Sequence, residues 1–124
     1  MKKNLKTKTK KEIKVEKILK TFKFKSRVIV WKNGIEKEDD SGAWRFARVP
    51  EKMSAEIKKM QKENLRRGWG AIYAKAKIGK SEWVTSIFPD RYSPTYILPL
   101  KKQIRYEENL YDGIDIIVTI GIWF

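Results

Sequence analysis

Two adjacent hydroxyl side chains, Thr85 and Ser86, are the sequence's nearest approach to a catalytic centre. The chain has no His and no Cys, which excludes Ser-His-Asp and Cys-His catalysis, disulfides and the usual zinc sites. A hydroxyl nucleophile needs a base, and only a lysine such as Lys80 or Lys101 could serve. Hydroxyls bonded to the backbone or to cross-strand neighbours are the simpler interpretation. We expect no catalytic residue, metal or cofactor; the residue set disfavours an enzyme and leaves that question open.

An excess of positive charge is the most prominent chemical feature of this sequence. The net charge is +14 and the isoelectric point about 10.0. Residues 1–20 hold nine Lys against two Glu, so a short segment carries half of the excess. Such a balance favours polyanions such as nucleic acid, although an ordinary lysine-rich surface stays open. With Thr85 and Ser86, the candidate residues for binding nucleic acid or another ligand are Lys75, Lys77, Lys101, Lys102 and Arg105.

Two further motifs resemble known sites but lack their spacing. Residues 79–81 read Gly-Lys-Ser, like the end of a phosphate-binding loop, but Ala74 stands where the first glycine belongs and a strand follows instead of a helix. We predict a hairpin turn there. The acidic residues of 36–40 lack the spacing of a calcium loop, and we interpret them as a solvated turn.

Alternating side chains predict six strands that position these residues. Apolar and polar residues alternate with a period of two over most of these segments, as in strands with one buried face. The clearest case is the last strand, where Ile114, Ile116, Val118, Ile120 and Ile122 share one face. Because Pro94 and Pro99 bound the fifth strand, we expect it at a sheet edge or a barrel mouth. The predicted strands are 21–31, 43–49, 69–78, 83–88, 95–98 and 114–123.

Two segments are predicted to be helices. Residues 51–65 have an apolar stripe that includes Ile57, and Ser54 is expected to cap this helix. Residues 100–110 predict a second helix of about three turns. Its lysines stand at the end where the helix dipole disfavours them. Local stability therefore does not explain Lys101 and Lys102, which we expect either to pair with nearby acids or to serve a ligand.

The order of these elements predicts a mainly β protein. We expect a small antiparallel split β-barrel of about six strands capped by two short helices. A length of 124 residues suits one domain. We expect residues 1–20 to be a flexible basic tail and residues 21–124 to be a single β-barrel domain.

Several motifs together resemble a bacterial and archaeal family of domains of unknown function. They are the WVTSIFP run of 83–89, the YILPLK run of 96–101 and Asp112-Gly113 before the aliphatic strand. Some members are fused to a bacteriocin-protection domain. The resemblance implies a double-split β-barrel similar to that of AbrB-type transcription regulators, which bind DNA as interleaved dimers. The family usually reads Gly-Asp before the last strand, whereas Ile114 intervenes here, so that turn departs from the pattern.

The sequence thus predicts a basic β-barrel that binds a polyanion such as nucleic acid without catalysing a reaction. One alternative is a small-ligand binder or enzyme that uses a polar barrel mouth. Another is a protein–protein assembly module, homo-oligomers included, that uses exposed Trp31, Trp69 or Trp123. The longest apolar run, 114–124, is shorter than a membrane helix requires and carries Asp115. We therefore expect a cytoplasmic protein with no membrane partner.

Overall fold

The computed structural model describes residues 15, 17–31, 43–64 and 70–124, and this part of the chain is mainly β. The strands are β1 (Lys20–Arg27), β2 (Ile29–Trp31), β3 (Trp44–Arg48), β4 (Ile72–Ile78), β5 (Ser81–Pro89), β6 (Tyr96–Pro99) and β7 (Asp115–Trp123), and the helices are α2 (Glu51–Glu63) and α3 (Lys102–Glu107). The acidic residues of 36–40, Trp69 and most of the basic tail lie outside the described residues.

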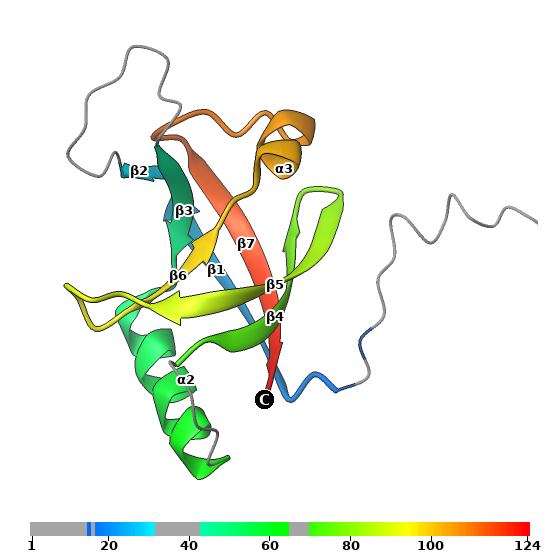
Figure 1. Cartoon of the computed structure of the whole chain (residues 1–124). Helices are drawn as coiled ribbons and strands as arrows, with labels where there is room; N and C mark the ends of the chain where they lie inside the picture. Colours follow the sequence, from blue (N-terminus) through cyan, green and yellow to red (C-terminus); the bar gives the residue numbers. More distant parts are fainter. Residues whose placement is uncertain (1–14, 16, 32–42, 65–69) are drawn as a thin grey trace, which may run out of the picture.

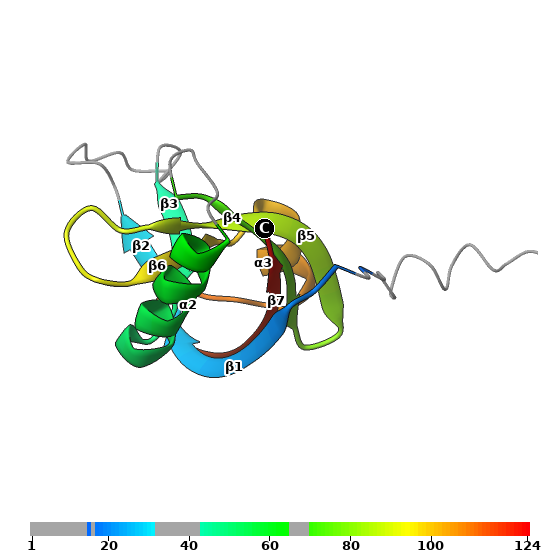
Figure 2. The same ribbon diagram turned by 90° about the horizontal axis from the view of Figure 1, so that it is seen from below.

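One antiparallel sheet holds all seven strands in the order β1-β7-β4-β5-β6-β3-β2. β1 and β2 follow each other in the chain yet lie at opposite ends of this order. The single strand predicted over 21–31 is interrupted at Val28, which makes seven strands instead of six. The Val28 amide donates to Ile114 O at 2.9 Å, and Val28 O accepts from the Gly113 amide at 2.8 Å. The chain passes through Val28 from β1 at one end of the strand order to β2 at the other. The sheet is therefore curled into a half-barrel (Figure 2).

The core fills the inside of this curl, as the alternation predicts. The inner faces of β4 and β7 are buried along their whole length. Burying such aliphatic side chains contributes on the order of 2 kcal/mol each. The core residues of these two strands are Ile72, Ala74, Ala76, Ile78, Ile116, Val118, Ile120 and Ile122.

The two helices lie at opposite ends of the curled sheet (Figure 1). Ile57 of α2 is fully buried, which confirms its place in the apolar stripe. The predicted cap at Ser54 is wrong, because α2 begins at Glu51 and no side chain caps it. Ser54 instead donates to Val49 O at 3.1 Å and accepts from the Tyr96 amide at 3.0 Å, joining α2 to the sheet. Neither helix in the described ranges has the length and apolar character that crossing a membrane demands.

Turns and prolines set the remaining elements. Ile78 pairs with Ser81 across a two-residue hairpin in which Gly79 has a φ of +59°, confirming the predicted turn. The edge position predicted for β6 is wrong, because β6 pairs with β3 on one side and β5 on the other. Pro99 is tolerated there because it is the last residue of the strand. α3 is shorter than predicted, and Asn109 behind it adopts a φ of 54°.

Candidate functional site

β5 and β6 are hydrogen-bonded neighbours over only part of their length. They pair at Phe88–Ile97 and Pro89–Tyr96. Beyond these pairs β5 continues beside β4 and β6 beside β3, so the two strands diverge toward α3 (Figure 1). We call the space between them the split. It opens where the chain carries the WVTSIFP and YILPLK runs, and so these runs form its two walls.

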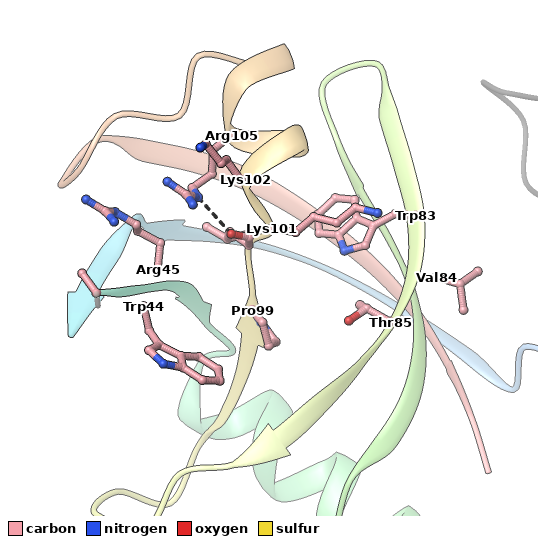
Figure 3. Close-up of a pocket in the computed structure, with 11 residues that line it drawn as sticks. Trp44, Arg45, Trp83, Val84, Thr85, Pro99, Lys101, Lys102 and Arg105 are labelled. Atoms are coloured by element: carbon pink, nitrogen blue, oxygen red, sulfur yellow. Dashed lines mark hydrogen bonds between the residues drawn. The ribbon is translucent and has the colours of Figure 1, made fainter. Parts of the chain in front are cut away.

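A hollow of about 310 Å³ occupies the split. Figure 3 shows Thr85 pointing from β5 toward this space and Val84 pointing away from it. Pro99 of β6 and the indole of Trp44 of β3 lie on the other side. Trp83 is 5% exposed and Trp44 57% exposed. The walls therefore offer aromatic and apolar surface with one hydroxyl among it.

Cationic side chains converge where the split meets α3. Lys101, Lys102 and Arg105 line the hollow together with Arg45 of β3, and none of the described residues that line it is acidic. Arg45 is largely buried and pairs with Asp112 through Nε–Oδ1 at 3.0 Å and Nη2–Oδ2 at 3.3 Å. Arg45 is thereby neutralised. The other three cations leave the hollow with an excess of positive charge.

The pKa of Arg105 is lowered, mainly by burial. Burial lowers the pKa of Arg105, the charge of Arg45 lowers it further, and Asp112 partly opposes both. The Arg105 Nε donates to Leu100 O at 3.0 Å (Figure 3), which fixes the guanidinium at the hollow. An arginine stays protonated at neutral pH despite such shifts. Asp112 already offsets part of the repulsion between the two guanidinium groups, and Arg105 remains charged at the hollow.

The reversed charge order of α3 has a structural explanation at one end only. Glu108 Oε2 accepts from the Lys80 amide at 3.2 Å and from Ser81 Oγ at 2.7 Å, which anchors the end of α3 to the β4–β5 hairpin. By contrast, Lys101 and Lys102 are exposed and form no ion pair with any residue that the structure describes. The pairing with nearby acids that we considered for these lysines is absent from the described residues.

The other candidate residues lie on the outer face of the sheet. Thr85 lies opposite Ala74, which is buried, whereas Ser86 lies opposite Tyr73, which is 56% exposed. Neighbouring residues of a strand point to opposite faces, so Ser86 does not contribute to the hollow. Lys75 and Lys77 alternate with buried alanines on β4 and also point outward.

Sequence reasoning missed Arg45 and Trp44. A signal for Arg45 existed, because Ala47 and Val49 are buried and a period of two places Arg45 on their face. Nothing in the sequence indicated Asp112 as its partner. The contact of Trp44 with the hollow depends on how β3 and β6 pair, which the sequence does not specify.

A second hollow of about 530 Å³ lies between α2 and the β5–β6 connection. At its rim Arg48 Nη1 binds Asp90 Oδ2 at 2.6 Å and Thr95 Oγ1 at 2.7 Å. Burial alone would raise the pKa of Asp90, but its bonds to Arg48, the Tyr92 amide and Ser93 outweigh burial and lower it. These bonds pair the polar groups of Arg48, Asp90 and Thr95 with one another, and we interpret them as structural.

Metal and family comparisons complete the description of the site. In the ranges that the structure describes, no three acidic side chains are grouped closely enough to hold a metal ion. A family model described as a domain of unknown function, DUF1905, matches residues 24–120. No curated protein matches the chain.

Proposed function

This chain belongs to the DUF1905 family, and we propose from its own geometry that it is a non-enzymatic binding module for a polyanion, namely single-stranded nucleic acid. The observation that carries the proposal is that Lys101, Lys102 and Arg105 line one hollow in which no described lining residue is acidic. Cations held together without partners are expected to bind phosphate groups.

The lining of the split favours nucleic acid over a simple salt ion. Trp44, which is 57% exposed, provides aromatic surface beside the cations, and bases stack on such side chains. The resemblance of the sequence motifs to a double-split barrel, similar to that of AbrB-type regulators, agrees with this proposal. A shared fold does not determine function, so the charges of the split carry the argument.

Binding is favoured over catalysis by the surroundings of Thr85. No hydrogen bond joins its hydroxyl to a lysine or a carboxylate within the described part of the chain. A hydroxyl without a base is a weak nucleophile. Thr85 is therefore proposed to donate to or accept from the ligand, not to attack it.

A small phosphorylated ligand is the second candidate, because a hollow of about 310 Å³ is at the lower limit of small-molecule sites. The two ligands can be separated by fluorescence anisotropy of a labelled oligothymidylate with the full chain. We expect Lys101→Gln/Lys102→Gln to weaken binding at least tenfold, while Lys52→Gln/Lys59→Gln on α2, which removes the same charge elsewhere, changes it much less. Competition by thymidine monophosphate at micromolar concentration would favour the small ligand. Equal binding by both double variants would contradict the proposal.

A further inference from the structure

The outer face of the sheet carries a stacked aromatic pair. Tyr73 of β4 and Trp123 of β7 are direct cross-strand partners, and their ring centroids lie 5.6 Å apart with an angle of 18° between the planes. Tyr73 is 56% exposed and Trp123 half-buried. Neither ring belongs to the core, which lies on the opposite face of both strands. Burial in the core therefore does not account for this pair, although Ile18 packs over Gly121 on the same face.

Cations lie on the same outer face, two and four residues along the strands from the pair. The register places Lys23, Thr119, Lys77 and Glu82 in one row across β1, β7, β4 and β5. Lys75 pairs with Glu82 at 3.8 Å, but Lys23 and Lys77 form no ion pair with a residue that the structure describes. The outward-facing cations of β1 and β4 are Lys23, Lys25, Arg27, Lys75 and Lys77, against the acids Asp115 and Glu82.

This combination of charge and rings restricts what could cover the face. A second copy of the chain would bring the same excess of positive charge against it, which is unfavourable. A negatively charged occupant that also carries flat rings complements both features. Single-stranded nucleic acid has unpaired bases available for stacking, whereas a duplex conceals them.

The outer face also connects to the split across β5. Val84 lines the hollow, is 50% exposed and points outward beside Lys75, its partner on β4. Adjacent strands are about 4.8 Å apart, so the row from Ser86 through Tyr73 to Trp123 spans about 10 Å. A strand whose phosphates lie at Lys101 and Lys102 could pass over β5 and reach this row.

We propose that the outer face of β4 and β7 is a second binding surface, on which the Tyr73–Trp123 pair stacks unpaired bases of a single-stranded nucleic acid while Lys23 and Lys77 contact its phosphates. The inference rests on the proposed function for the class of ligand. The surface differs from the split because its two rings stack on each other across paired strands on the outer face of the sheet.

The test compares a ligand that has bases with one that has none. The full chain is titrated with an oligothymidylate of about 12 nucleotides, within the site sizes of small β-barrels, and with inorganic polyphosphate of similar charge. Tyr73→Leu should weaken oligothymidylate binding about tenfold and leave polyphosphate binding unchanged. Tyr73→Phe keeps the ring and should behave as the wild type. Circular dichroism checks that the half-exposed position tolerates both changes.

The outcomes separate this inference from the proposed function. Equal oligothymidylate affinities for Tyr73→Leu and Tyr73→Phe would overturn the outer surface and leave the split in place. Failure of the wild-type chain to bind any single strand would overturn both. As an independent measurement, an oligonucleotide containing 5-iodouracil should form photocrosslinks at Tyr73 or Trp123. Crosslinks confined to Trp44 and Trp83 would contradict the inference.

Discussion

Removal of the lysines at the split should change how strongly salt weakens nucleic-acid binding. Each phosphate that a cation neutralises releases condensed counterions, so the logarithm of the binding constant falls linearly with the logarithm of the salt concentration. Lys101, Lys102 and Arg105 are the cations of the hollow that remain available to a ligand, since Arg45 is paired with Asp112. Three phosphate contacts are therefore expected at the split.

The magnitude follows from this count. A single strand gives a slope of about −0.7 per phosphate, so three contacts give about −2.1 and a loss of roughly twentyfold between 50 and 200 mM salt. Lys101→Gln should reduce the slope to about −1.4, and Lys101→Gln/Lys102→Gln to about −0.7, with a loss of roughly threefold over the same range. Phosphate contacts made by other cations add the same amount to the slope of the wild type and of each variant. The differences between slopes are therefore the quantities to compare.

The assay is anisotropy of a labelled oligothymidylate with the full chain across a series of salt concentrations. Lys59→Gln is the matched control, because Lys59 is an exposed lysine of α2 outside the split. Lys59→Gln should leave the slope within about 0.2 of the wild-type slope, which is well below the change of about 0.7 that one phosphate contact produces. Identical slope changes for Lys59→Gln and Lys101→Gln would refute the reasoning, because binding would then respond to total charge and not to the position of the cations.

Three substitutions test the packing and ion pairing of the fold away from the split. Ile57→Ala should lower the free energy of unfolding by about 3 kcal/mol, measured by urea denaturation, because Ile57 is fully buried under α2. Gly121→Ala should cost about 1 kcal/mol because its Cβ would lie 2.7 Å from Ile18 Cδ1, and a double-mutant cycle should show that Ile18→Ala removes this cost. Asp90→Asn should lower stability at neutral pH by about 1 kcal/mol through loss of the Arg48 pair. Because the folded state lowers the pKa of Asp90, the wild type should lose this advantage as the pH falls below about 4, and parallel denaturation curves should then converge.

The strands could be predicted because buried and exposed side chains alternate along each segment. The buried residues of β4 and β7 follow from this local pattern alone. The interruption of the first predicted strand at Val28 could not be predicted in this way. It depends on backbone hydrogen bonds to Gly113 and Ile114, which lie far along the chain. For the same reason the prolines around β6 suggested an edge, although the structure pairs β6 on both sides.

Part of the candidate site could also be predicted. The reversed charges of α3 drew attention to Lys101 and Lys102, and the hollow brings both together with Thr85 and Arg105. Ser86 was grouped with Thr85 by adjacency, yet a strand directs consecutive side chains to opposite faces. The Tyr73–Trp123 stack requires the register between β4 and β7, and no local pattern specifies it.

The geometry of α3 explains how the split can hold unpaired cations together. α3 has six residues and gains little stability of its own, so burial of Leu100 and Ile104 and the bonds from Glu108 to the β4–β5 hairpin fix its position. That hairpin also supplies Trp83 and Thr85 to the opposite wall. The cations and the β5 wall are therefore positioned by the same contacts, before any ligand arrives. A bound phosphate would therefore meet cations whose backbone positions the fold already fixes, which lowers the cost of ordering the site on binding.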